Sequence, residues 1–179
     1  MKEFLIETFA QHRTLIVFLH VLSAVIWVGG MIAIRFATHQ SLALISDPKL
    51  RLERAAHTLK RLFSIVWPFV IILIITAVLM AVGLGFRAAA VDASGNVIDE
   101  YAMSLYNTVH IKEAIWLVMA LNLGAMMFRR RKAEEALKAG NIEAAKGLLG
   151  MIAKYMVPVN IVLGLIAIYI GVFLRGAYS

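Results

Sequence analysis

The chain has 179 residues, of which 61% are hydrophobic, with no cysteine and a formal net charge of +7. This combination is typical of an integral membrane protein, and it excludes disulfides and thiolate-bound metals. The charge does not indicate nucleic acid, because the lysines and arginines gather beside apolar runs, where anionic lipid headgroups account for them. The sequence contains no nucleophile triad, phosphate loop or zinc-protease motif, so hydrolytic catalysis is not expected.

Four apolar runs are long enough to span a membrane, which takes about 20 residues of helix. They cover about residues 15–36, 62–84, 109–128 and 155–174. No internal repeat or low-complexity segment divides the chain, so residues 1–179 are expected to form a single transmembrane domain. The predicted fold class is therefore all-α, an integral membrane four-helix bundle.

Basic residues are concentrated in two of the three connections between these runs, at residues 35–61 and 129–154. The middle connection contains only Arg87 among basic residues. The positive-inside rule therefore predicts a multi-pass protein of a bacterial-type inner (cytoplasmic) membrane, with both basic connections in the cytoplasm and both termini outside. The middle connection, residues 85–107, is predicted to be a flexible polar turn on the outer side.

The helices are predicted to be longer than the membrane is thick. Ser46 or Asp47 can cap a helix, and the proline that follows suits its first turn. A helix over residues 48–84 would be about 55 Å long, against a hydrocarbon thickness of about 30 Å. The second basic connection is also rich in helix formers, with Gly140-Asn141 as a turn signal. We therefore expect two antiparallel helical hairpins that extend into the cytoplasm.

The first apolar run has a stripe of polar and aromatic residues. At 100° per residue, Trp27 and Arg35 lie within about 60° of His20, as do Ala24 and Met31. Ionisable side chains at bilayer depth are costly and usually face a cavity, a partner or a cofactor. The simpler interpretation is that His20 is a hydrogen-bonded histidine of the bundle and that Trp27 only packs.

His20 and His110 lie at similar depths. Counted from Leu15 and Tyr106 as outer boundaries, His20 is about 7 Å deep and His110 about 6 Å deep. Two imidazoles at one level on facing helices can bind one haem iron from its two faces. His20 and His110 are therefore the predicted iron ligands, with Trp27 beside them.

Lys112 is an alternative to His110, since the two are about 160° apart on a helix and cannot both face one cavity. Either His110 faces inward and Lys112 extends to the headgroups, or Lys112 faces inward and His110 is interfacial. We favour His110 as the second ligand, because a neutral imidazole binds iron without the deprotonation that an ammonium requires.

His39 and His57 form a second candidate site at the inner face, on either side of the predicted first cytoplasmic turn. They are candidates for binding a metal or a second haem, or they are surface histidines close to water. Arg35, Lys60 and Arg61 lie at the same level, where they can bind carboxylates such as haem propionates or meet lipid phosphate. We favour one haem per chain, because these cations disfavour a further metal ion.

The other polar and small residues of the spans are interpreted as packing residues. Asn122 and Asn160 are expected to form interhelical hydrogen bonds rather than to bind a ligand. Thr76 and Gly83 share one face of the second span and are expected to pack against a neighbouring helix. The methionines in the apolar runs show no paired spacing that indicates a copper site.

His20, Trp27, Gly30, Arg35 and His39 together form a pattern that resembles the first helix of the HemJ-type protoporphyrinogen oxidases and of the related copper resistance D (CopD)-like membrane proteins. The segments PFVIILIITAVLMAVG and VHIKEAIWLV are similar to the second and third helices of this superfamily. The resemblance implies a haem b protein with His20 as the leading ligand. It also implies functional importance for Arg35, His39 and Lys112.

Three functional hypotheses follow. The leading one is an integral membrane haem b redox protein, acting in electron transfer or as a haem-dependent oxidoreductase on a porphyrinogen, a quinol or a reactive oxygen species. The alternatives are a copper transport or handling protein, and a non-catalytic partner subunit. The expected partners are the lipid bilayer and a membrane-associated or lipid-soluble redox partner, with a second copy of the chain as a further candidate.

Overall fold

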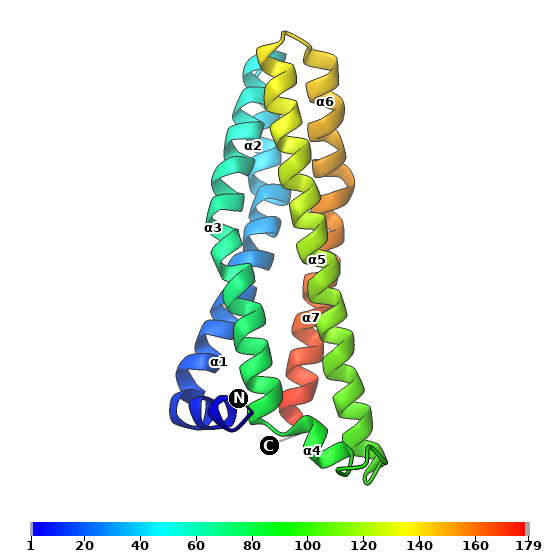
Figure 1. Ribbon diagram of the computed structural model, residues 1–179. Helices are drawn as coiled ribbons and strands as arrows, with labels where there is room; N and C mark the ends of the chain where they lie inside the picture. Colours follow the sequence, from blue (N-terminus) through cyan, green and yellow to red (C-terminus); the bar gives the residue numbers. More distant parts are fainter. Residues whose placement is uncertain (1, 178–179) are drawn as a thin grey trace.

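The computed structural model describes residues 2–177 as a long bundle of helices (Figure 1). The helices are α1 (Lys2–Ala33), η1 (Ile34–Thr38), α2 (His39–Ala43), α3 (Pro48–Gly83), α4 (Phe86–Ala90), α5 (Glu100–Lys138), α6 (Ile142–Met151), η2 (Ile152–Met156) and α7 (Val157–Gly176). Four continuous rods, 35 to 43 residues long, are apolar enough to cross a membrane. The prediction of an all-α bundle with four long apolar helices is confirmed.

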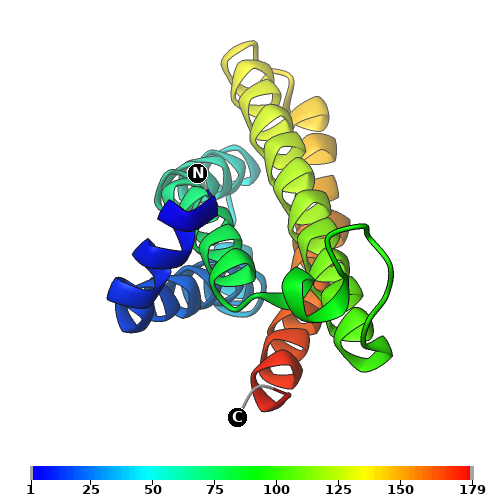
Figure 2. The same cartoon turned by 60° about the horizontal axis from the view of Figure 1, so that its bottom comes forward.

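The rods form two pairs, with α1 beside α3 and α5 beside α7 (Figure 2). Both ends of the chain lie at the same end of the bundle as α4, while the α2–α3 and α5–α6 connections lie at the opposite end (Figure 1). This up-and-down order is the one expected for two antiparallel hairpins joined by short connections.

Helix α3 begins where the capping signal predicted. The Asp47 carboxylate accepts hydrogen bonds from the main-chain N–H groups of Lys49 (2.8 Å) and Leu50 (3.3 Å), and Pro48 occupies the first helical position. The helix has 36 residues. At 1.5 Å per residue it is about 54 Å long, well beyond the roughly 30 Å of a hydrocarbon core.

The predicted turn between α5 and α6 is also present. Gly140 has a φ of +75°, a conformation that costs glycine little, and the Asn141 side chain accepts the N–H of Ala144 at 3.0 Å. The chain reverses direction over these two residues, because Gly140 adopts the left-handed conformation after α5 and Asn141 caps the start of α6.

The connection between α3 and α5 differs from the prediction. The turn was predicted to cover residues 85–107, but it ends earlier. Asp99 caps α5, and that helix starts at Glu100. The loop before it is closed by a bridge between Val91 and Val97. Asp92 accepts the main-chain N–H groups of Asn96 and Ser94, and the first of these bonds is the main reason why the pKa of Asp92 lies below its ordinary value.

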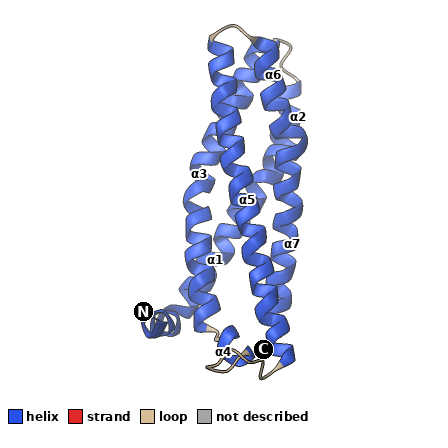
Figure 3. Cartoon of the chain, turned by 45° about the vertical axis from the view of Figure 1, so that its right-hand side comes forward, coloured by secondary structure: helices blue, strands red, loops and turns tan. Residues whose placement is uncertain are grey.

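The first turns of α1 leave the bundle sideways, as Figure 3 shows. The helix bends at His12, whose φ of −119° and ψ of 24° are not helical. Phe9 packs against Gly83 so closely that a Cβ atom on Gly83 would clash with the Phe9 ring. The predicted packing role of Gly83 is confirmed, and its partner is the N-terminal arm of the chain.

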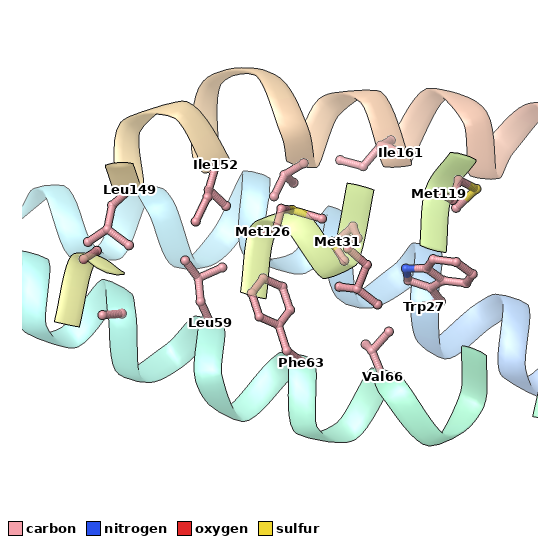
Figure 4. Close-up of a cluster of buried hydrophobic side chains, with 14 of the residues drawn as sticks. Trp27, Met31, Leu59, Phe63, Val66, Met119, Met126, Leu149, Ile152 and Ile161 are labelled. Carbon is pink, nitrogen blue, oxygen red and sulfur yellow. The ribbon is translucent and has the colours of Figure 1, made fainter. Parts of the chain in front are cut away.

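A long apolar core fills the interior of the bundle (Figure 4). Trp27 and Met31 of α1, Phe63 of α3, and Leu123 and Met126 of α5 are all at most 1% exposed. The buried methionines belong to this core, where their flexible thioethers fill space between rings and branched side chains.

Asn122 and Asn160 connect α5 to α7 inside the bundle. The Asn122 amide donates to Asn160 Oδ1 and to the Met156 carbonyl, both at 2.8 Å. The Asn160 amide in turn donates to the Met119 carbonyl at 3.3 Å, and Asn160 is fully buried. The prediction that these two amides form interhelical hydrogen bonds is confirmed.

We expect Asn160→Leu to destabilise the protein by about 1 to 2 kcal/mol, because it leaves the Asn122 amide with one partner fewer. Replacing both asparagines with leucine should cost less than the sum of the two single replacements, since no unpaired amide remains. Denaturant unfolding in detergent micelles measures both effects. Strictly additive losses would contradict the coupling between the two amides.

Candidate functional site

A polar layer interrupts the apolar interior in the half of the bundle that contains the chain termini. Its three main side chains come from three helices: His20 from α1, Thr76 from α3 and Lys112 from α5. On one side lies the long core that includes Trp27 and Met119. On the other lies a small separate cluster built from Phe86, Leu105 and Leu174.

His20 is held by a hydrogen bond between its Nδ1 atom and Thr76 Oγ1, at 3.0 Å. The Thr76 hydroxyl has one hydrogen, and the nearest acceptor for it is the Ile72 carbonyl at 2.7 Å. With its hydrogen donated to Ile72, Thr76 Oγ1 can accept from His20 Nδ1, and the ring also interacts with the Leu73 carbonyl. In the tautomer with the proton on Nδ1, the Nε2 atom keeps its lone pair, the state required of a histidine that binds a metal.

Lys112 points into the bundle toward α7. A Cβ atom placed on Gly171 would lie 3.0 Å from Lys112 Nζ, so the absence of a side chain at Gly171 leaves room for the ammonium. The ammonium is close enough to His20 to interact with it electrostatically. Within residues 2–177, no carboxylate lies within 4.0 Å of Lys112 Nζ.

The direction of Lys112 follows from the register of α5. Lys112 precedes Met119 by seven residues and Met126 by fourteen, and both methionines are buried. Seven residues are almost two full turns, so all three share the core-facing side of the helix. This seven-residue spacing to two methionines is the sequence signal that identifies Lys112 as the inward residue. A comparison of depths alone does not contain it.

The orientation predicted for His110 is wrong. Its side chain is 52% exposed, and its Nδ1 atom lies 2.9 Å from the carboxylate of Glu113 on the same helix. The Tyr106 ring packs edge-on against it. His110 precedes Met119 by nine residues, or half a turn away from the core side, so matching depth does not bring it to face His20.

Thr76 is a member of this layer that the sequence analysis treated only as a packing residue. It is the one hydroxyl between Phe69 and Leu84 and is 4% exposed. A single hydroxyl on the buried side of an otherwise apolar helix was the available signal, because in such surroundings it needs a hydrogen-bond partner on another helix.

Trp27 is part of the apolar core (Figure 4), and its predicted place beside a cofactor stays a prediction. It is 1% exposed, and its indole Nε1 finds no acceptor among residues 2–177. Next to Trp27, α1 and α7 are in close contact, since a Cβ atom on Gly164 of α7 would clash with the side chain of Val28. The polar layer ends at this contact. Any flat group bound at His20 therefore lies on the terminal side of this close helix contact.

The residues of the inner candidate site lie at the other end of the spans. His39 and His57 are both exposed, as are Lys60 and Arg61, and Arg35 is partly exposed. Across the described part of the chain, no three histidine, aspartate or glutamate side chains gather in a way that could hold a metal ion. A shared metal or haem at His39 and His57 stays a prediction.

The fold and the polar layer define a class: an all-α bundle of four membrane-length helices with a histidine and a lysine in its interior. Comparison of the chain with protein-family models, curated proteins and solved structures finds no match in any of the three. The resemblance to the HemJ-type and CopD-like superfamily therefore stays an expectation based on the residues quoted above.

The absence of cysteine in the sequence allows single cysteines to test the two orientations on α5. We expect His110→Cys to react with a membrane-impermeant maleimide added to intact cells, because the side chain is exposed and the predicted topology places it near the outer boundary. Lys112→Cys should stay unlabelled until the protein is denatured. Ser94→Cys, in the exposed outer loop, is the positive control. Faster labelling at position 112 than at 110 would contradict the structure.

Proposed function

We propose that the chain is an integral membrane haem b protein that acts in electron transfer or in oxidation of a membrane-associated substrate. One observation carries this proposal: a histidine hydrogen-bonded to Thr76 interacts electrostatically with a lysine that has no carboxylate partner among residues 2–177, inside an apolar bundle. Polar groups of this kind are costly in a membrane interior and typically mark a functional site.

His20 fits the role of a residue that would bind haem iron. Histidines that bind metals usually donate the hydrogen of the other ring nitrogen to a fixed acceptor, which sets the ring orientation and raises its basicity. Thr76 Oγ1 provides this acceptor at 3.0 Å. His20 Nδ1 belongs to α1, and Thr76 Oγ1 and the Ile72 carbonyl belong to α3. One helix pair therefore positions the His20 ring.

Lys112 fits the role of a charge partner rather than that of a second ligand. An ammonium without a carboxylate beside it favours binding of a negatively charged group, and haem b has two propionates. Gly171 leaves the space that the ammonium occupies. This geometry favours Lys112 over His110 as the residue of α5 that faces the cofactor.

Haem b, when bound, supplies reversible one-electron chemistry at its iron. The residues of the chain then have separate tasks: His20 binds the iron, Thr76 orients His20, and Lys112 neutralises a propionate. The apolar core beyond Gly164 excludes water from one side of the layer. Porphyrinogens, quinols and reactive oxygen species are the proposed substrate classes. The proposed location is an inner membrane, with both termini on its outer face.

The alternative functions have distinct signatures. A copper-handling protein would be colourless in its Cu(I) form and would bind copper stoichiometrically, and a partner subunit would show neither copper nor haem. The buried methionines Met31, Met119 and Met126 belong to the apolar core, so their burial has an explanation that does not involve copper.

We expect the purified protein to show a Soret band and reducible b-type peaks, and His20→Ala to lose them while the protein still inserts into the membrane. Losing one imidazole changes the hydrophobicity of the helix little but removes the iron ligand. Wild-type haem content in His20→Ala would contradict the assignment of the ligand.

Lys112→Met should weaken haem retention roughly tenfold, as expected for loss of one charge-assisted contact, without a change in the spin state of the iron. Lys112→Arg should restore part of the affinity. His110→Ala is the matched control on the same helix and should leave both haem content and spectrum unchanged. A low-spin spectrum in the wild type that becomes high-spin in Lys112→Met would instead identify Lys112 as an iron ligand.

One haem per chain is expected, because the polar layer is the only described region that combines a partly buried histidine with a cationic partner. The ratio of haem to protein, measured by pyridine haemochrome assay, should be near one and should not change in His57→Ala. A ratio near two that falls to one in His57→Ala would support the second site at His39 and His57.

A further inference from the structure

A groove lies at the opposite end of the apolar spans, between the η1 and η2 segments. Its volume is about 510 Å³, within the range of roughly 300 to 1,000 Å³ typical of sites for small ligands. It is lined by Arg35, His39, Gly147, Gly150, Met151, Ala153, Lys154 and Tyr155. None of these residues belongs to the polar layer around His20, which lies about 22 Å away along the first rod, counted as fifteen residues from His20 to Arg35.

Both walls of the groove contain π-helical turns. The His39 N–H bonds to the Ile34 carbonyl, and the Val157 N–H bonds to the Ile152 carbonyl, each five residues back. The η2 turn precedes Pro158, whose ring would crowd a regular helical turn, but no proline explains η1. Single π-turns inside α-helices occur frequently at functional sites.

The groove is positively charged. Arg35 and Lys154 line it from opposite walls, and His39 lies beside Arg35 on the η1 side. In the part of the chain that the structure describes, no carboxylate lies within 4.0 Å of any of these three side chains. Two permanent cations without internal partners favour binding of a phosphate or carboxylate group.

Large apolar side chains surround the same groove. Tyr155 is 53% exposed and Met151 42%, and both line the groove at the predicted inner boundary of the spans. Lys154 lies over the Tyr155 ring, with Nζ 5.2 Å from the ring centroid. A soluble anion would use only the cations, whereas an amphiphile would place its headgroup on the cations and its chains on the apolar rim.

We propose that this groove binds the phosphate of an anionic phospholipid from the cytoplasmic leaflet. Basic pockets between membrane helices on the cytoplasmic side are known to suit such headgroups. The proposal depends on membrane placement of the spans and not on haem, so each proposal can fail without the other.

The groove can be filled without displacing any part of the protein. A Cβ atom on Gly147 or on Gly150 would have no neighbouring atom within 4 Å. A leucine at position 150 would therefore occupy the space of the headgroup while both cations stay in place. Gly124 on α5 is equally open, and it lies outside the groove, so it provides a matched control.

The first test measures phosphatidylglycerol binding to the purified full chain in detergent by native mass spectrometry. We expect Arg35→Gln with Lys154→Gln to weaken binding about tenfold or more, since each cation near a headgroup contributes substantially. Lys60→Gln with Arg61→Gln removes two exposed cations at the same end and should change it less than twofold. An equal loss in both double variants, or equal binding of zwitterionic phosphatidylcholine to the wild type, would overturn the proposal.

The second test separates a lipid from a free anion and does not alter any charge. Gly150→Leu should weaken phosphatidylglycerol binding about tenfold, while Gly124→Leu should leave it unchanged. Inorganic phosphate at millimolar concentration should not displace the lipid from the wild type. Full binding by Gly150→Leu, or displacement by inorganic phosphate, would overturn the assignment to a phospholipid.

Discussion

The hydrogen bonds between Asn122 and Asn160 set the register of α5 against α7, and the polar layer depends on that register. Inside an apolar bundle an amide gains little from its surroundings and must find a partner on another helix. From this contact, Lys112 lies ten residues along α5 and Gly171 eleven residues along α7, or about 15 Å and 16 Å in the same direction, because the helices are antiparallel. The hydrogen bonds between the two asparagines therefore place Gly171 beside Lys112.

The polar groups of the interior differ in how completely they are satisfied. The two asparagines bond each other and main-chain carbonyls, and Thr76 bonds both His20 and its own helix. Lys112 has no internal carboxylate, and Trp27 Nε1 has no acceptor, among residues 2–177. Lys112 is partly buried, and a cation in an apolar interior costs stability. Under the proposed function, a negatively charged ligand would offset that cost.

Much of the fold could be predicted because its determinants are local. The apolar runs, the Asp47 cap and the Gly140-Asn141 turn each depend on a few adjacent residues, and all are present in the structure. Which side of α5 faces inward depends on packing against three other helices, and depth alone placed His110 wrongly. Thr76 was underestimated for the same reason, since its role depends on His20 of another helix. The π-turns leave no clear signal apart from Pro158, because each changes one hydrogen bond without changing the apolar pattern.

The polar layer and the cationic groove are separated by a fully buried part of the apolar core. Trp27, Met31, Phe63, Leu123 and Met126 fill the bundle between them and are all nearly inaccessible to solvent. Because these side chains exclude water, solvent reaches the polar layer and the groove from opposite ends of the bundle. The two regions share no side chain, so a ligand at one of them would be bound by residues that the other does not use. Variants in one region can therefore be interpreted without reference to the other.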